Sequence, residues 1–365
     1  MDELMTSRQT IEEIDKEMAK LFEKRMDVAA KIAAYKREKG LAVKDSARED
    51  ALIEKNTGNI ENPDYEGYYV NFLRNTIEIS KRYQEKLLSG MKVAYSGAAG
   101  AFAYIAAKTL FSEAELICKH DFGLAYKSVE NGECDCAVLP LENSYAGEVS
   151  TVLDMAFSGS LFINQVIDLP VKHCLLGLPG SDRNSIKKVI SHPQALAQCG
   201  DYIERHGFTT KGFGNTALAA ERVKEMNDPS VAAIASKETA EIMGLEILDE
   251  NIQDSGINTT RFGVFSRSEN SKKPEGRKDD EQFILVFSVK NEAGALAQTL
   301  NIIGAHGYNM RSLRSRPMKG LLWEYYFFIE AEGNINTENG QDMLRELGAL
   351  CARLKMLGSY NTFNA

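Results

Sequence analysis

Residues 7–39, SRQTIEEIDKEMAKLFEKRMDVAAKIAAYKREK, decide the fold of the N-terminal part of this chain. Apolar residues recur three and four positions apart along this stretch, which is the spacing of one face of an α-helix. They are Ile11, Ile14, Met18, Leu21, Phe22, Val28, Ala29 and Ile32. The pattern predicts one long helix, with a capping box from Thr6 to Gln9 at its start and Gly40 at its end.

Two cations, Arg25 and Lys36, fall near the middle of this apolar stripe, about three helical turns apart. One such residue is ordinarily a side chain that carries its charge to the surface. Two cations on the same apolar face each need an anion nearby, because a buried charge without a partner is costly. A buried anionic ligand is the simplest candidate. Arg8 lies about 60–100° away from the stripe, so we expect it to serve a different chain or pocket.

The composition of the 365-residue chain narrows the class of protein. The length predicts two or three domains, and 44% hydrophobic with 26% charged residues is typical of a soluble globular protein. The absence of a long apolar run or of a signal-peptide pattern, together with six cysteines, predicts a cytosolic protein with reduced thiols and no membrane partner. The net charge of -9 argues against nucleic-acid binding and implies that local clusters of Arg and Lys hold any anionic substrate.

Two further helices complete the N-terminal region. Asp45 and Ser46 open the second one, where Ser46 and Glu49 fit a capping box, and Gly58 ends it. Asn62 and Pro63 supply an N-cap and a first-turn proline for the third helix, which runs to about residue 88 before a glycine at position 90. The region is therefore predicted to be all-helical.

Polar residues interrupt the apolar stripe of the third helix. Ser80 and Gln84 stand on the stripe formed by Val70, Leu73, Ile77 and Leu88. Either residue alone is more often a satisfied hydrogen-bonding group in a core. Together with Arg25 and Lys36 they predict a polar pocket inside a helical bundle.

Residues 5–88 resemble the all-helical chorismate mutase at the front of bifunctional P-proteins. The resemblance implies that chorismate is bound by Arg8, Arg25, Lys36, Asp45, Arg48, Glu49, Ser80 and Gln84. It also implies that two chains interlock and that Arg8 reaches the partner's site. Because the rearrangement of chorismate is pericyclic, it needs a folded dianion and charge stabilisation at the ether oxygen, which suits Lys36 and Gln84 as catalytic groups. The three arginines suit the two carboxylates, Glu49 the substrate hydroxyl, and Asp45 the orientation of its neighbours.

From residue 92 onward the pattern changes to short strands that alternate with helices, which predicts an α/β domain. The expected strands are 92–96, 136–141, 161–167, 187–191, 231–236 and 261–266, and the expected helices include 193–206 and 216–226. Cys134 and Cys136 sit in a strand pattern without a second pair of metal ligands, so we interpret them as structural.

Four groups of polar residues follow the predicted strands, at the place where ligands of open α/β sheets bind. They are 142–144, 191–194, 215–216 and 258–262. Each alone reads as a cap or turn. The set resembles prephenate dehydratase over residues 92–267, most specifically at Thr260-Arg261-Phe262. The resemblance implies that Thr260 carries the catalytic hydroxyl and that Glu142, Asn143, Ser191 and Gln198 line the substrate cleft, with Arg261 beside it. Thr216 is also expected to bind the substrate.

A stretch without large apolar residues, 268–280, predicts a linker before a last domain at 281–365. The β-α-β-β-α-β order of that domain is ferredoxin-like, and it resembles an ACT regulatory domain. The resemblance implies phenylalanine as effector, bound by Gly294, Ala295, Leu296, Asn309, Ser315, Arg316 and Pro317. Arg314 stands where that family usually has Glu, so it either repels the ammonium group of the effector or points to solvent.

These resemblances predict a multidomain enzyme: an all-α chorismate mutase at 1–90, a two-lobed α/β prephenate dehydratase at 91–267, and an α+β ACT domain. We expect it to make prephenate from chorismate, and phenylpyruvate from prephenate, as a homodimer or higher homo-oligomer without a metal or organic cofactor. Two other hypotheses remain at this point. The dehydratase prefers arogenate as its substrate, or the chain is a non-catalytic amino-acid sensor.

Overall fold

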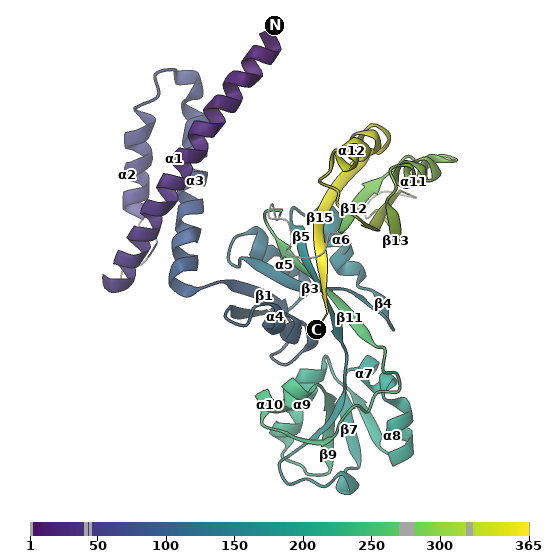
Figure 1. Ribbon diagram of the computed structural model, residues 1–365. Helices are drawn as coiled ribbons and strands as arrows, with labels where there is room; N and C mark the ends of the chain where they lie inside the picture. Colours follow the sequence, from purple (N-terminus) through teal and green to yellow (C-terminus); the bar gives the residue numbers. More distant parts are fainter. Residues whose placement is uncertain (1–2, 40–42, 44–45, 270–280, 319–323, 365) are drawn as a thin grey trace. The chain divides into compact units, whose positions relative to one another are not determined.

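The computed structural model describes residues 3–39, 43, 46–269, 281–318 and 324–364, shown in Figure 1. Asp45 and most of the predicted linker lie outside these residues. The chain divides into two compact units, Met1–Lys92 and Val93–Ala365, and each is described by itself. Within the described ranges, no helix combines the length and the apolar content that crossing a membrane requires.

The first unit consists of helices α1 (Glu3–Lys39), α2 (Ser46–Thr57) and α3 (Pro63–Ser89). Helix α3 packs against both α1 and α2. Ala29 and Ala33 on α1 and Leu73 and Ile77 on α3 are buried between the helices. The small alanines allow the two helices to approach closely at this point.

The predicted helix ends are confirmed for α3, whereas the predicted start of α1 is wrong and its last helical residue, Lys39, agrees with the predicted stop. The Asn62 side chain accepts a hydrogen bond from the Asp64 backbone N–H, and Pro63 stands in the first turn. Helix α1 already includes Glu3, whose carbonyl accepts from Ser7 Oγ over 2.9 Å. Thr6 therefore lies inside the helix and is not its N-cap, because the helix finds its first hydrogen-bond acceptors further upstream.

The N-terminal half of α1 keeps its apolar stripe exposed in a single chain. Ile11, Ile14 and Leu21 are 58%, 53% and 65% exposed. Figure 1 shows α1 extending beyond α2 and α3 at this end. A contiguous apolar stripe of this kind ordinarily marks a protein contact surface.

The second unit contains two lobes, and the first is built on a mixed sheet. Its strands are β1 (Lys92–Ser96), β2 (Glu115–Lys119), β3 (Cys136–Asn143), β4 (Gly147–Glu148), β5 (Phe162–Pro170) and β11 (Thr259–Ser266). Strands β5, β11, β3, β1 and β2 follow one another across the sheet, and β4 pairs with β3. The helices are α4 (Phe102–Leu110), α5 (Phe122–Glu130) and α6 (Ser150–Ser158).

The second lobe is a five-stranded sheet in the order β10-β6-β9-β7-β8. The strands are β6 (Cys174–Gly177), β7 (Lys188–Ser191), β8 (Thr209–Gly212), β9 (Val231–Ala235) and β10 (Glu246–Asp249). Its elements outside the sheet are η1 (Arg183–Ser185), α7 (Pro193–Gln198), α8 (Gly200–His206), α9 (Thr216–Met226) and α10 (Lys237–Met243). The predicted single helix 193–206 is two helices, because Cys199 leaves the helical conformation with φ -120° and ψ 27°.

The C-terminal subdomain has the predicted β-α-β-β-α-β order. It comprises β12 (Glu281–Ser288), α11 (Ala295–Ala305), β13 (Asn309–Pro317), β14 (Tyr325–Glu332), α12 (Glu338–Leu350) and β15 (Arg353–Asn364). Its sheet continues into that of the first lobe, since β15 pairs with β12 on one side and, at Thr362 opposite Val166, with β5 on the other. A Cβ on Gly358 would lie 1.8 Å from the Ile163 carbonyl oxygen, so only glycine permits this approach.

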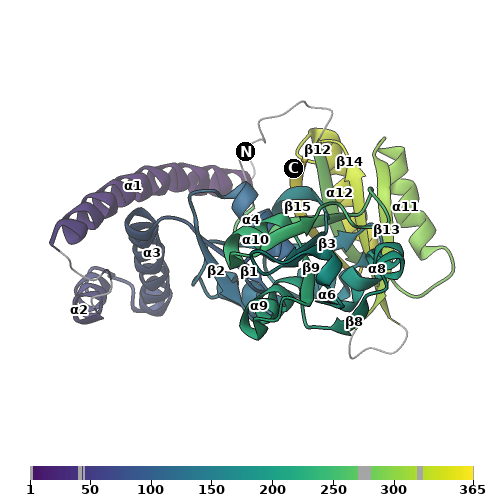
Figure 2. The same ribbon diagram turned by 90° about the horizontal axis from the view of Figure 1, so that it is seen from below.

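Strand β12 is buried on both faces, and its alternate residues belong to different cores. Phe283, Leu285 and Phe287 pack with residues of α11 and α12, and Figure 2 shows α11 beside β13. Ile284 and Val286 pack with the apolar residues of the first lobe. The C-terminal subdomain therefore shares a hydrophobic core with the lobe that it follows.

Candidate active sites

The two cations on the α1 stripe both have hydrogen-bond partners inside the helical unit. Arg25 Nε donates to Ser80 Oγ over 3.1 Å, and Ser80 donates to the Thr76 carbonyl. Lys36 Nζ donates to the Val43 carbonyl over 2.6 Å. Packing of α1 on α3 thus brings Arg25 and Ser80, two of the predicted site residues, into direct contact.

Gln84 lies one turn beyond Ser80 on α3 and is 8% exposed. Its Oε1 atom is buried without a hydrogen-bond partner among the described residues. A buried amide group without a partner is costly. The position is therefore suited to a polar group that a ligand supplies.

The remaining predicted residues of this unit are more dispersed. Glu49 Oε2 lies 3.0 Å from Lys81 Nζ, and Lys81 also contacts Glu78 at 2.9 Å. The hydrogen bond with Glu78 raises the pKa of Lys81 above its usual value. Arg8 and Arg48 are exposed in the single chain.

A cavity of about 340 Å³ opens between the two lobes of the second unit. Strands of the first lobe contribute Thr260 and Asn143 to its lining, and the second lobe contributes Gln198 and Thr216. The structure therefore brings these four predicted residues together. Other lining residues include Phe102, Pro140, His173, His192, Gln194, Asn215 and Phe262.

The Asn143 side chain forms hydrogen bonds with two separate segments of the chain, one at the start of β11 and one directly after β3. Its Nδ2 atom donates to Thr260 Oγ1 over 2.9 Å and to Asn258 Oδ1 over 2.8 Å. Its Oδ1 atom accepts from the backbone N–H groups of Tyr145 and Ala146. With its Oγ1 already accepting from Asn143, the Thr260 hydroxyl has its hydrogen available for another group, and no acceptor for it is present among the described residues.

Gln198 and His173 form a buried pair at the wall of the cavity. His173 Nε2 lies 3.0 Å from Gln198 Oε1, and the two residues are 1% and 7% exposed. Burial lowers the pKa of His173, which favours a neutral ring. Since the amide oxygen only accepts, His173 donates from Nε2 and leaves the Gln198 NH₂ group as a donor for a ligand.

The sequence predicts that clusters of Arg and Lys hold an anionic substrate, and the lining of the cavity differs from this prediction. Among the described residues that line it, there is neither Arg nor Lys. Helix N-termini take their place: Ala101 and Phe102 open α4, and Asn215 and Thr216 open α9. The N–H groups and the dipole at a helix N-terminus favour an anion, so backbone groups supply the positive potential here.

Three of the residues predicted to bind prephenate do not line the cavity, and one of them, Arg261, was expected beside the cleft. Thr260 pairs with Asn143 across β11 and β3, and the next pair is Arg261 with Glu142. Because neighbouring side chains of a strand face opposite ways, Arg261 and Glu142 face away from it. Ser191 is fully buried and donates to the Ile234 carbonyl over 2.6 Å, so its hydroxyl is bound within the second lobe.

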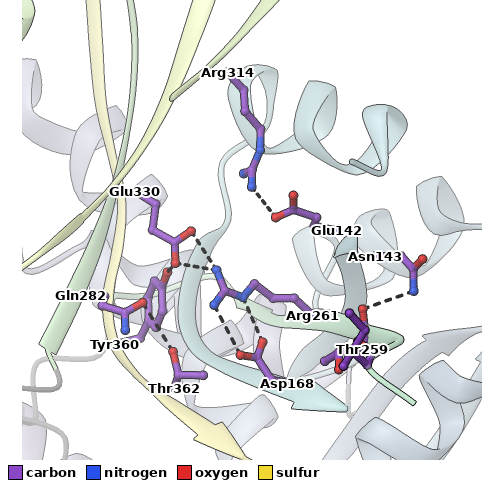
Figure 3. A network of polar contacts seen from close by, with 11 residues as sticks. Glu142, Asn143, Asp168, Thr259, Arg261, Gln282, Arg314, Glu330, Tyr360 and Thr362 are labelled. Carbon is purple, nitrogen blue, oxygen red and sulfur yellow. Dashed lines mark hydrogen bonds and ion pairs between the residues drawn. The ribbon is translucent and has the colours of Figure 1, made fainter. Parts of the chain in front are cut away.

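Arg261 and Glu142 both contact the C-terminal subdomain (Figure 3). Arg261 Nη1 lies 2.8 Å from Glu330 Oε1, and its Nε lies 2.9 Å from Asp168 Oδ1. Glu142 forms an ion pair with Arg314 of β13. The expectation that Arg314 points to solvent is wrong, because its side chain is only 16% exposed and is directed at a carboxylate. Repulsion of the effector's ammonium group stays a prediction.

The residues predicted to hold an effector surround the start of α11 and one edge strand. Gly294 precedes α11 with φ 86°, and Ala295 and Leu296 form its first turn. Asn309 Nδ2 donates to Glu332 Oε2 over 2.9 Å. The positive φ of Gly294 is a conformation that favours glycine.

Strand β13 divides the rest of the predicted effector set between its two faces. Ser315 and Pro317 are exposed. Arg316 faces the first lobe, where it contacts Glu148 at 2.9 Å and Asp154 at 3.1 Å. The positive charge of Arg316 is therefore neutralised by carboxylates of the same chain.

Sequence reasoning did not assign roles to three residues that line the cavity, His173, His192 and Gln194, or to Asn258, which contacts the lining residue Asn143. His192 Nδ1 accepts from the Gln194 backbone N–H, which makes it the N-cap of α7. Asn258 holds Asn143 Nδ2. Both lie inside polar groups that the sequence did single out, and that proximity was the available signal. His173 precedes an apolar run and carries no such signal.

The geometry and the order of the parts define a two-lobed dehydratase that follows a helical mutase and precedes a regulatory domain. Family models match in that order: chorismate mutase type II at residues 7–85, prephenate dehydratase at 93–270 and the ACT domain at 283–349. A bifunctional chorismate mutase/prephenate dehydratase of Enterobacter agglomerans is 32% identical over 99% of this chain and 96% of that protein. The chain belongs to the family of bifunctional chorismate mutase/prephenate dehydratases.

Two solved structures resemble the second unit. Prephenate dehydratase of Arthrobacter aurescens, solved in complex with L-Phe, is 29% identical with a TM-score of 0.68, covering 74% of this chain and 90% of that one. GqqA, described as a quorum-quenching acylase, is 32% identical with a TM-score of 0.69, covering 74% of this chain and 98% of that one.

Proposed function

We propose that the helical unit converts chorismate to prephenate and that the cavity of the second unit converts prephenate to phenylpyruvate, carbon dioxide and water. The hydrogen bond from Asn143 to Thr260 carries the dehydratase part of the proposal, because it leaves the Thr260 hydroxyl as a donor inside the cavity between the lobes. Family membership favours an enzyme over a sensor. Prephenate, the mutase product, is favoured over arogenate because the chain supplies it to its own dehydratase. The domain boundaries of this proposal are 1–90, 91–267 and 281–365.

In the mutase, Arg25, Arg48 and Arg8 bind the two carboxylates of chorismate, since guanidinium groups are permanent bidentate donors. Lys36 and Gln84 stabilise the charge that develops on the ether oxygen. The NH₂ group of the buried Gln84 amide can donate to that oxygen, whereas its unpartnered Oε1 can only accept a hydrogen bond from a ligand. Ser80 fixes Arg25 over 3.1 Å, while Glu49 holds the substrate hydroxyl and Asp45 orients its neighbours.

The mutase acts as a homodimer in which α1 of one chain packs on a second copy. Its exposed apolar residues Ile11, Ile14 and Leu21 support this arrangement. Arg8, on the same half of the helix, then enters the site of the partner copy. Dimerisation therefore buries the apolar stripe of α1, and it adds Arg8 of one chain to the substrate-binding cations of the other.

In the dehydratase, the bond from the ring to one carboxyl group breaks, and its electrons enter the ring as carbon dioxide leaves. The ring becomes aromatic as its hydroxyl departs with the electrons of the C–O bond. Thr260 donates its hydrogen to this leaving oxygen, which forms water once a proton is supplied, and solvent restores any proton that Thr260 transfers. Asn143 holds the Thr260 oxygen from the other side.

The substrate carboxylates bind at the N-termini of α4 and α9, where Phe102 and Thr216 line the cavity, because the first N–H groups of a helix favour an anion. Gln198, oriented by His173, adds a side-chain donor. Phenylalanine binds the C-terminal subdomain near Gly294 as an effector. We place the enzyme in the cytosol, which its six free cysteines support.

Incubation of the purified protein with chorismate, followed by chromatography of the products, tests the proposal. We expect prephenate to appear first and phenylpyruvate to follow. Supplied prephenate should give phenylpyruvate, and supplied arogenate should react more slowly. The absence of any product from chorismate, with prephenate also unchanged, would contradict both activities.

A further inference from the structure

Asn143 and Thr260 face the cavity as a cross-strand pair, and the next cross-strand pair faces the opposite side of the sheet. In the register of β3 and β11, Thr260 lies opposite Asn143 and Arg261 lies opposite Glu142. Side chains of neighbouring residues leave a strand on opposite faces. In Figure 3, Arg261 and Glu142 reach toward side chains of the C-terminal subdomain.

Arg261 binds two carboxylates, and both belong to strands on the same side of β11 in the sheet order. Its guanidinium contacts Asp168 on β5 and both carboxylate oxygens of Glu330 on β14, the latter over 2.8 and 2.9 Å. Glu330 is 2% exposed and also accepts a hydrogen bond from Tyr360 Oη over 2.6 Å. A buried carboxylate requires its cation, so Arg261 and β14 are held together strongly.

Glu142 has a cation of the C-terminal subdomain as its partner. Arg314 on β13 binds its carboxylate, and the Arg314 guanidinium lies 5.6 Å from the centre of the Phe328 ring. Figure 3 shows this pair beside the Arg261 contacts. The two pairs have opposite polarity: the subdomain supplies an anion to Arg261 and a cation to Glu142.

Backbone pairing is irregular where these residues lie. The register of β11 on β3 shifts between Arg261 and Phe262, because Arg261 lies opposite Glu142 and Phe262 lies opposite Pro140. Leu141 is thereby an extra residue, and such a bulge locally disrupts the ladder of hydrogen bonds. Side-chain contacts therefore have a larger part in fixing Thr260 and Asn143 than they would in a regular sheet.

We propose that Arg261 and Glu142 are positioning residues, through which the C-terminal subdomain sets the place of Thr260 and Asn143. The pairs Arg261–Glu330 and Glu142–Arg314, here called the two-pair clamp, hold the dehydratase in its active geometry. A ligand that shifts β13 or β14 relative to β3 and β11 then changes the dehydratase rate through this clamp. The inference rests on the proposed function of Thr260.

A charge-swap experiment on the full chain tests the clamp. Arg314→Glu places two carboxylates together, and we expect kcat on supplied prephenate to fall about 10- to 100-fold while KM changes less than about twofold. Glu142→Arg should lower kcat similarly, and the double variant Arg314→Glu/Glu142→Arg should recover most of the lost rate. Arg345→Glu reverses an exposed charge on α12 of the same subdomain and is the matched control. Mutase activity of every variant should stay at the wild-type value.

An unchanged kcat in Arg314→Glu, or a double variant no faster than the single variants, would overturn the clamp. Should Arg314→Glu fail to fold, Arg314→Gln and Glu330→Gln are judged by the same split between kcat and KM. Thr260→Ala separates this result from the proposed function. If that variant keeps full dehydratase activity, the proposed role of Thr260 is wrong. If Thr260→Ala is slow but Arg314→Glu keeps the wild-type kcat, only the two-pair clamp is rejected.

Discussion

Asn143 Nδ2 donates to Thr260 Oγ1 over 2.9 Å, and this bond sets the direction of the Thr260 hydroxyl hydrogen. A threonine hydroxyl is a weak acid in water, but a positioned donor in a cavity between two lobes can still bind a leaving oxygen. Asn143 itself is fixed by Asn258 and by two backbone N–H groups. The chemistry of the second unit therefore depends on a donor whose orientation the fold determines.

Lys36→Ala should remove the mutase reaction and leave the dehydratase reaction intact. Loss of one electrostatic donor of this kind typically lowers a rate about 10²- to 10³-fold. The measurement is the rate of prephenate formation from chorismate, with phenylpyruvate formation from supplied prephenate as the internal control. A variant that makes prephenate at nearly the wild-type rate would show that Lys36 only holds the Val43 carbonyl.

Leu21→Glu should dissociate the expected homodimer and abolish the mutase reaction, because it puts a charge on the apolar stripe of α1. Sedimentation velocity reports the oligomeric state. Ile257→Glu is the matched control, since Ile257 is 83% exposed but lies in the second unit. If Leu21→Glu sediments like wild type and stays active, the exposed stripe of α1 is not the interface.

Gly294→Val should weaken the binding of phenylalanine. Gly294 has φ 86°, which strains a β-branched residue. Its added Cβ would also stand in open space at the start of α11, where a ligand would approach. Isothermal titration of wild type and variant measures the difference, and no binding heat with wild type would remove phenylalanine as the effector.

Local features of the fold were predictable because local residues determine them. Asn62 and Gly90 end α3 as expected, since a cap needs only its own turn. The continuation of β15 onto β5 was not predictable, because it depends on a long-range approach that Gly358 permits. The exposure of Ile11 and Leu21 in a single chain was also not predictable, since periodicity identifies an apolar face but not what covers it.

The sequence located the strand ends of the cavity but not the direction of each side chain. Polar groups 142–144 and 258–262 were identified correctly as neighbours, and β3 does pair with β11. Which residue of each group faces the cavity depends on the strand register and on the bulge at Leu141, and neither can be read from a single sequence. Glu142 was therefore assigned to the cleft and Arg261 to a place beside it, although both face the C-terminal subdomain.

The most direct test of the account is the product mixture that Thr260→Ala makes from chorismate. Two separate sites predict that prephenate accumulates at the wild-type rate while phenylpyruvate formation falls about 10²- to 10⁴-fold. Thr260→Ser should retain part of the activity, because it keeps the hydroxyl. Rapid formation of phenylpyruvate by Thr260→Ala would contradict the assignment of the hydroxyl as the catalytic donor.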